Sequence, residues 1–195
     1  MIIDGKQIAA EMLARTKERA TQLSHEPLVV AIRGNEPKAT ESYLAIKKRR
    51  AADAGCRLEV RAYEELYADA DAVIVQLPLA PGLDTAGTLN AIPLENDADV
   101  LSDAARQQFE AGAPDALLPP VVGAVREILA RHNIDPRWKS VVVVGDGRLV
   151  GSPVAAWFKQ QGALVQVVTR TSGDLALLKG ADIIVSGAGS PGLIK

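Results

Sequence analysis

The most informative segment of this chain reads Ser140-Val141-Val142-Val143-Val144-Gly145-Asp146-Gly147, with Gly151 and Pro153 shortly after it. An unbroken run of β-branched residues predicts a strand buried on both faces, as in a parallel sheet covered by helices. The glycines predict a tight turn into a helix over residues 150–161, whose N-terminal N–H groups favour a phosphate. Glycine-rich turns also occur where the backbone only needs room to pack closely against its neighbours and no ligand is bound. The pattern alone therefore leaves nucleotide binding and an ordinary turn both open.

Strand and helix patterns alternate on both sides of this segment. Short apolar runs predict strands at 28–32, 58–60, 72–75, 164–169 and 181–185, and helical spacing predicts helices at 7–23, 41–54, 84–90, 121–131 and 174–178. The alternation indicates an α/β fold in which right-handed crossovers join parallel strands. We expect two domains that meet near Pro136: an N-terminal α/β catalytic domain over residues 1–135, and a Rossmann-type nucleotide-binding domain with a parallel sheet over residues 136–195.

The composition argues against several classes of protein. The chain has 195 residues, of which 48% are hydrophobic and 24% charged, so it can bury a core. Its 22 Lys and Arg against 24 Asp and Glu give a net charge of -2, which argues against nucleic acid or an anionic membrane surface as a partner. The single cysteine, Cys56, excludes an internal disulfide and a cysteine metal cluster, and no metal site is predicted. The first five residues lack the apolar run of a signal peptide, and no apolar run reaches the roughly 18–20 residues of a membrane span, so we expect a cytoplasmic protein.

Charged residues near the glycine-rich turn bear on the choice of cofactor. Asp146 would repel a 2′-phosphate and would accept a hydrogen bond from a ribose 2′-hydroxyl, which favours NAD. Arg148 and Arg170 lie near the ends of adjacent predicted strands, where they could bind a phosphate, which favours NADP. Either arginine is equally compatible with a solvated surface position. The residues themselves therefore leave NADP and NAD open.

Four polar residues in the first half are candidates for chemistry. Tyr43 and Lys47 share one face of a predicted helix, where the phenol can stack on a planar substrate and the ammonium can deliver charge or a proton. The same spacing occurs when a tyrosine packs and a lysine extends to solvent. Gln76 ends a predicted buried strand, a frequent place for functional side chains in α/β folds. Asp99 lies in a predicted loop, where aspartate is also a common turn former.

Seven motifs occur in a single order along nearly the whole chain. They are Ile3-Asp4-Gly5-Lys6, Tyr43-x-x-x-Lys47, Val75-Gln76-Leu77-Pro78-Leu79, Asn90-Ala91-Ile92-Pro93, Asp97-Ala98-Asp99, Val150-Gly151-Ser152-Pro153 and Ala181-Asp182-Ile183-Ile184-Val185. In this order the chain resembles the bifunctional methylenetetrahydrofolate dehydrogenase/methenyltetrahydrofolate cyclohydrolase family, or FolD-like family. The second and third motifs together are the most specific part of the resemblance.

The resemblance implies a tetrahydrofolate derivative as substrate. It implies oxidation of 5,10-methylenetetrahydrofolate to 5,10-methenyltetrahydrofolate with NADP, or alternatively NAD, and hydrolysis of that product to 10-formyltetrahydrofolate. Lys47 would be the principal catalytic residue and Tyr43 would stack on the folate. Gln76 would hydrogen-bond Lys47 and tune it, and Asp99 would hold the pterin ring.

The resemblance also implies a cofactor site and an assembly. The cofactor-binding residues would be Gly145, Asp146, Gly147, Gly151, Arg170 and Thr171. Family members are commonly homodimers through the nucleotide-binding domain, so a homodimer is implied here. The enzyme would belong to one-carbon metabolism and support purine biosynthesis.

Three segments depart from the family pattern. Asp97-Ala98-Asp99-Val100 stands where the family has Asp-Val-Asp-Gly, Gly145-Asp146-Gly147 stands where it has Gly-Arg-Ser, and Leu118-Pro119-Pro120 lacks the Cys-Thr pair of its Pro-Cys-Thr-Pro segment. The family also continues beyond the point where this sequence ends, so we expect a shortened second domain. These departures motivate an alternative function, a catalytically impaired folate- or nucleotide-binding relative that acts as a partner subunit. A third hypothesis is another two-domain Rossmann dehydrogenase with a different small substrate, because a fold alone does not specify chemistry.

Overall fold

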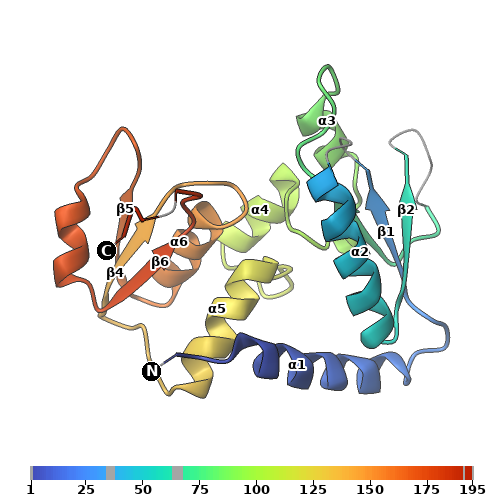
Figure 1. The fold of residues 1–195 in the computed structure, drawn as a ribbon, viewed down its shortest axis with the longest axis horizontal. Helices are drawn as coiled ribbons and strands as arrows, with labels where there is room; N and C mark the ends of the chain where they lie inside the picture. Colours follow the sequence, from blue (N-terminus) through green and yellow to red (C-terminus); the bar gives the residue numbers. More distant parts are fainter. Residues whose placement is uncertain (1, 34–37, 63–67, 191, 195) are drawn as a thin grey trace. The chain divides into compact units, whose positions relative to one another are not determined.

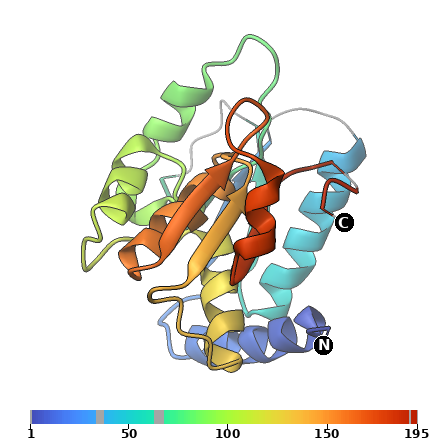
Figure 2. The same ribbon diagram turned by 90° about the vertical axis from the view of Figure 1, so that its left-hand side faces the viewer.

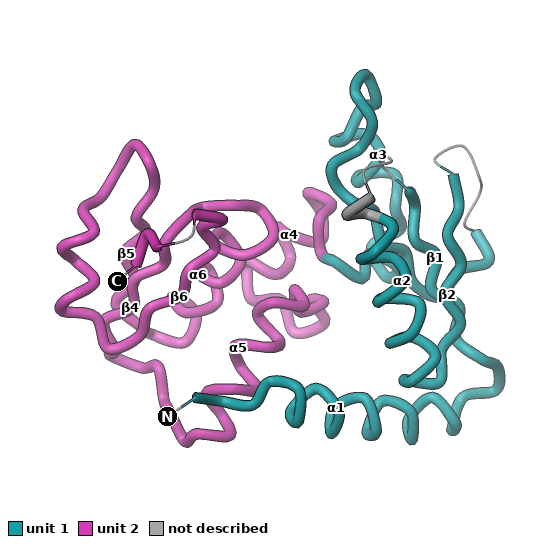
Figure 3. Tube along the Cα trace, in the orientation of Figure 1, with its two compact units in different colours: residues 1–99 teal, residues 100–195 magenta. Residues whose placement is uncertain are grey.

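The structure, a computed structural model, describes residues 2–33, 38–62, 68–190 and 192–194, with the backbone alone for 38–40. The segment Arg33-Gly34-Asn35-Glu36-Pro37 predicts a loop, of which residues 34–37 lie outside the described residues. The chain divides into two compact units, residues 1–99 and residues 100–195 (Figure 3). No helix among the described residues is both long and apolar enough to cross a membrane.

The division between the units differs from the boundary at 135/136 that the sequence suggested. It falls after Asp99 because helices α4 (Asp103–Glu110) and α5 (Pro120–Arg131) both pack against α6 (Gly151–Gln160) of the nucleotide-binding half. The side-chain amide Nε2 of Gln160 also donates to the carbonyl oxygen of Phe109 in α4, at 2.6 Å. A polar connection around Pro136 is therefore a loop inside the second unit.

The first unit contains a parallel sheet of three strands in the order β2-β1-β3. These are β1 (Leu28–Ile32), β2 (Arg57–Arg61) and β3 (Ala72–Val75). Helix α2 (Lys38–Asp53) lies between β1 and β2 in the chain and beside the sheet (Figure 1). Its Leu44 packs with Ala31 and Leu58 of the sheet. Helix α1 (Gly5–Ala20) precedes the sheet, and α3 (Thr85–Asn90) and the short η1 (Leu94–Asn96) follow it.

The second unit contains a parallel sheet in the order β5-β4-β6. Its strands are β4 (Ser140–Val144), β5 (Leu164–Val168) and β6 (Ile183–Ser186). Helix α6 covers one face and the short helix η2 (Leu175–Gly180) lies on the other, as Figures 1 and 2 show. The four valines of β4 are at most 3% exposed because both faces of the central strand are covered.

The α/β fold with two parallel sheets confirms the predicted fold class. Every predicted strand is present within two residues of its expected bounds. Two elements were not predicted, η1 and α4. Helix α2 begins at Lys38, earlier than the start at residue 41 that the sequence predicted.

Both sheets place their first strand in the centre, with the second and third strands on opposite sides. In open parallel sheets, ligands bind at the carboxyl ends of the strands where the chain changes direction across the sheet. In the first sheet Gln76 directly follows β3 at this end, and in the second sheet Gly145 directly follows β4. Each unit therefore has one edge at which a ligand site is expected, and both edges carry residues singled out from the sequence.

Candidate active site

Helix α2 places Tyr43 and Lys47 on the first unit. Leu44, buried at 5% exposure, holds this part of the helix against the sheet. Tyr43 is 62% exposed, so its ring has a free face for a planar ligand. Lys47, one turn further along, is half-buried. The lysine is therefore less exposed than the neighbouring Lys48 of the same helix.

Gln76 presents a buried acceptor at the carboxyl end of β3. Its backbone N–H donates to the carbonyl oxygen of Ile32 at 3.0 Å, which continues the sheet by one residue. Its side-chain Nε2 donates to the carbonyl oxygen of Leu77 at 3.3 Å. The other amide atom, Oε1, is buried and has no hydrogen-bond donor in the described part of the chain. A buried carbonyl oxygen without a donor is costly to stability, so its presence suggests a role in binding.

Asp99 follows a short bridge between its own segment and β3. Asp97 forms a parallel bridge with Val73 of β3, and the N–H of Ala98 donates to the carbonyl oxygen of Val73 at 3.2 Å. Asp99 lies two residues beyond this bridge, in a turn, and is half-buried. Val100, which replaces the family's glycine, has φ of +54° and is buried at 3% exposure. The loop thus keeps a glycine-like backbone with a β-branched residue, a strained arrangement held by packing.

Lys47 and Asp99 interact electrostatically although they are far apart in the sequence. Burial raises the pKa of Asp99, the positive charge of Lys47 acts to lower that pKa, and the negative charge of Asp97 adds to the rise. The predicted hydrogen bond between Lys47 and Gln76 is not present among the described residues. The charge of Lys47 thus acts on Asp99, and the Gln76 acceptor lacks a donor in the described part of the chain.

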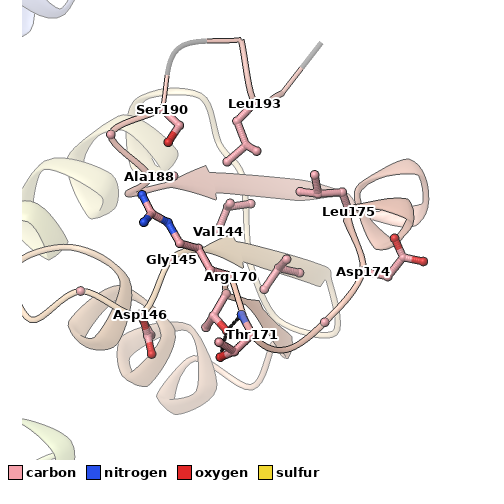
Figure 4. Close-up of a pocket in the computed structure, with 15 residues that line it drawn as sticks. Val144, Gly145, Asp146, Arg170, Thr171, Asp174, Leu175, Ala188, Ser190 and Leu193 are labelled. Atoms are coloured by element: carbon pink, nitrogen blue, oxygen red, sulfur yellow. Dashed lines mark hydrogen bonds between the residues drawn. The ribbon is translucent and has the colours of Figure 1, made fainter.

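The second unit has a cavity of about 690 Å³ at the carboxyl ends of its strands (Figure 4). Its lining includes Gly145, Asp146, Gly147, Arg170 and Thr171 of the predicted set. Gly145 has φ of +95°, a conformation that favours glycine, and its N–H donates to the carbonyl oxygen of Val168 at 2.7 Å. The turn at Gly145 therefore holds the end of β4 against β5, and Gly145 itself lines the cavity.

A compact loop after β5 carries Arg170 into this cavity. The Thr169 hydroxyl oxygen accepts the N–H groups of Thr171 at 3.2 Å and of Ser172 at 3.0 Å, which fixes the loop around Arg170. In Figure 4 the Arg170 side chain extends toward Gly145 and Ala188, whereas Asp146 points away from it. The arginine is thus the cation that the cavity offers to a phosphate, and the Asp146 carboxylate lies at its margin.

Several lining residues were not among those predicted from the sequence. They are Val144, Val168, Thr169, Gly173, Asp174, Leu175, Ala188, Gly189, Ser190 and Leu193. Those after β6 have a sequence signal, because Gly187-Ala188-Gly189 directly follows a predicted strand that neighbours β4. Parallel strands end at the same edge, so a second glycine-rich turn there predicts a second cavity wall.

Gly151, in contrast, does not line this cavity. It is buried at the start of α6, where an added Cβ would lie 2.6 Å from the carbonyl carbon of Gly145. Gly151→Ala is therefore expected to lower the free energy of unfolding by about 1–3 kcal/mol through overpacking. Gly147→Ala is the matched control, because nothing lies within 4 Å of its Cβ. Urea unfolding of both variants checks this, and equal stability of the two would contradict the assigned contact.

Comparison with known proteins identifies the family. A family described as tetrahydrofolate dehydrogenase/cyclohydrolase, NAD(P)-binding domain, matches residues 119–195. The bifunctional protein FolD of Lacticaseibacillus paracasei is 32% identical over 212 residues, which cover 98% of this chain and 74% of that protein. The bifunctional protein FolD of Maricaulis maris is 33% identical over 215 residues, which cover 100% of this chain and 72% of that protein.

The chain belongs to the FolD family. Among solved FolD structures, the Trypanosoma brucei N5,N10-methylenetetrahydrofolate dehydrogenase-cyclohydrolase, complexed with NADP and an inhibitor, superposes with a TM-score of 0.89 at 27% identity and covers 100% of this chain and 73% of its own. The bifunctional FolD enzyme of Campylobacter jejuni has a TM-score of 0.92 at 24% identity, over 98% and 75% of the two chains, and supports the fold alone. The resemblance predicted from the motifs is thus confirmed, and with it the Rossmann-type assignment of the second unit.

Proposed function

We propose that this chain oxidises 5,10-methylenetetrahydrofolate to 5,10-methenyltetrahydrofolate with NAD(P) and hydrolyses the product to 10-formyltetrahydrofolate. The observation that carries the proposal is the buried amide oxygen of Gln76, which follows β3 directly and has no hydrogen-bond donor in the described part of the chain. Membership of the FolD family supports this function over a non-catalytic partner subunit and over a dehydrogenase of unrelated substrate.

The first reaction demands alignment more than acid–base chemistry. Loss of hydride from the carbon that bridges N5 and N10 leaves a cation stabilised by both nitrogens, so no proton transfer is needed. NAD(P), when bound, supplies the hydride acceptor. In the second unit Gly145, Gly147, Arg170 and Thr171 would hold it, since their cavity combines a glycine turn with a cation suited to phosphate. The family's cofactor class therefore fits the residues present.

The second reaction gives Lys47 its role. Water adds to the methenyl carbon, and the ring opens as one nitrogen accepts a proton. The half-buried Lys47 would move that proton, and the Gln76 Oε1, which lacks a donor in the described structure, would accept a hydrogen bond from its ammonium and orient it. The Asp99 carboxylate would accept N–H bonds from the amide-like edge of the pterin, while the exposed Tyr43 ring would stack on the folate.

The cofactor preference, the assembly and the location of the protein are inferred from the cavity and from the family resemblance. We infer NADP as the preferred cofactor with NAD as the alternative, because Arg170 lines the cavity and the Asp146 side chain points away from that arginine. We also infer a homodimer in the cytoplasm, whose 10-formyl product would serve purine biosynthesis. No nucleic acid or membrane partner is proposed, since the net charge is -2.

One assay tests the proposal. The purified chain is mixed with 5,10-methylenetetrahydrofolate and either NADP or NAD, while the absorbances of reduced nicotinamide and of methenyltetrahydrofolate are followed. We expect nicotinamide reduction, with methenyltetrahydrofolate that is then consumed. Folate binding without turnover on either cofactor would instead support the non-catalytic relative.

A further inference from the structure

The segment that leads to Asp99 covers part of the outer edge of β3. Strand β3 is the last strand in the order β2-β1-β3 and pairs with β1 alone among the described strands. The carbonyl groups on its other side need donors from elsewhere, because a carbonyl group without a hydrogen bond is costly to stability. Residues 96–98 supply such donors, directly before Asp99 in the chain.

Asn96 supplies its donors from the side chain. Its Nδ2 donates to the carbonyl oxygen of Ala70 at 2.9 Å and to that of Asp71 at 3.1 Å, just before β3 begins. Asn96 is half-buried in this position. A side-chain amide therefore does here what a backbone N–H does between paired strands, and it ties the segment of residues 96–99 to the start of β3.

The attachment continues as a short parallel bridge. Asp97 pairs with Val73, and the N–H of Ala98 donates to the carbonyl oxygen of Val73 at 3.2 Å. Successive side chains of an extended segment point to opposite sides, so a slip of one residue would turn Asp97 out of its buried position. The same slip would displace the turn that carries Asp99. The register of this bridge therefore determines where the Asp99 carboxylate lies.

We propose that Asn96 is a positioning residue for substrate binding, whose side chain fixes the register of this bridge and thereby the position of Asp99. The inference rests on the proposed function, in which Asp99 accepts N–H bonds from the pterin. A bridge of one residue pair is a weak attachment by itself, because even a two-stranded pair is only marginally stable. The carbonyl groups that Asn96 contacts are themselves fixed by the sheet, since the N–H of Asp71 donates to the carbonyl oxygen of Leu28 in β1 at 2.9 Å.

Loss of the Asn96 amide should loosen this segment and leave the sheet intact. In Asn96→Ala the two carbonyl oxygens lose this donor, and the bridge at Val73 remains to hold the residues before Asp99. Binding of a pterin would then include the cost of ordering the Asp99 turn, so the affinity should fall. A residue that serves overall stability alone would instead affect the whole first unit and would not act through Asp99.

Amide hydrogen exchange of the chain without ligand tests the attachment. In Asn96→Ala we expect the Ala98 N–H to exchange about 5- to 100-fold faster than in the wild type, the range that corresponds to two lost hydrogen bonds. The Gln76 N–H, which donates to β1 on the other side of β3, should be unchanged. Glu95→Ala, which truncates the exposed neighbour of Asn96, should match the wild type. An unchanged rate for Ala98, or an equal rise for both amides, would overturn the proposal.

A double-mutant cycle tests whether Asn96 acts through Asp99. The affinity for 5-formyltetrahydrofolate, a stable reduced folate, is measured by calorimetry in the wild type, Asn96→Ala, Asp99→Ala and the double variant. We expect Asn96→Ala to weaken binding about 10-fold in the wild-type background and less than about 2-fold in the Asp99→Ala background, where the positioned carboxylate is absent. An equal loss in both backgrounds would make Asn96 a structural residue and overturn the proposal.

The two measurements separate this proposal from the proposed function. If Asn96→Ala does not fold, the wild type decides: its Ala98 N–H must be protected from exchange, and fast exchange of that amide overturns the proposal. Faster exchange of Ala98 in Asn96→Ala, together with a wild type that binds no folate, would support the attachment by Asn96 and refute the proposed function.

Discussion

Lys47→Met is expected to lower the cyclohydrolase rate by about 10²–10⁴-fold, the range that a positioned acid–base group contributes. Methionine keeps the length and packing of the half-buried chain but has no proton to move. Folate binding should fall much less, because Tyr43 and Asp99 are the groups assigned to hold the ring. The dehydrogenase rate should also fall less, since hydride loss needs no proton transfer. The two measurements are the rate of methenyltetrahydrofolate hydrolysis, followed by absorbance, and the affinity for folate, measured by calorimetry.

Lys48→Met is the matched control for this variant. Lys48 is the next residue of α2 and is exposed, so its loss removes the same charge from the same helix without touching the edge at Gln76. Its hydrolysis rate should stay near that of the wild type. If Lys47→Met lost folate binding and hydrolysis in equal proportion, Lys47 would be a binding group and the proton-transfer role would be refuted.

Local sequence patterns were enough to predict the helices and strands that carry the two candidate sites. The valine run of β4 and the glycines after it predict a covered central strand and a tight turn, and both are present with Gly145 at φ of +95°. These signals are strong because burial on both faces and a positive φ each restrict the residues allowed. Helix α4 lacked such a signal: its buried face consists of Ala105 and Phe109 alone, in a short and mostly polar helix. It forms because it packs on α6, a tertiary contact that no local window contains.

In the candidate site, too, the local sequence does not show the tertiary contacts of single side chains. Gln76 and Lys47 could be named from motifs, but the amide oxygen left without a donor is visible only in the structure. Asp97 and Asp99 look alike in the sequence, as two aspartates of one loop. The bridge to Val73 distinguishes them, because the bridged Asp97 is buried whereas Asp99 is half-buried. This difference in burial depends on a long-range contact and could not be predicted from the loop sequence.

Asp146→Arg is expected to raise the preference for NADP over NAD by about 10- to 100-fold. The change removes a carboxylate that repels a 2′-phosphate and adds a group that binds phosphate with charge-assisted hydrogen bonds, each worth about 1.5–3 kcal/mol. Asp146 lies at the margin of the cavity and is exposed, so an arginine fits there without disturbing the core. The ratio of kcat/KM for the two cofactors measures the effect.

A control must separate a local contact from the overall change in charge. Asp115→Arg makes the same change in charge at an exposed position of the second unit, outside the cavity lining. If the added positive charge attracted the more negative NADP in a general way, the NADP/NAD ratio of kcat/KM would rise in this variant as well. A shift in Asp146→Arg alone places the 2′-phosphate beside the glycine turn. An unchanged ratio in both variants would assign the discrimination to Arg170 and the hydroxyl groups of its loop, because Arg170 is the cation that lines the cavity among the described residues.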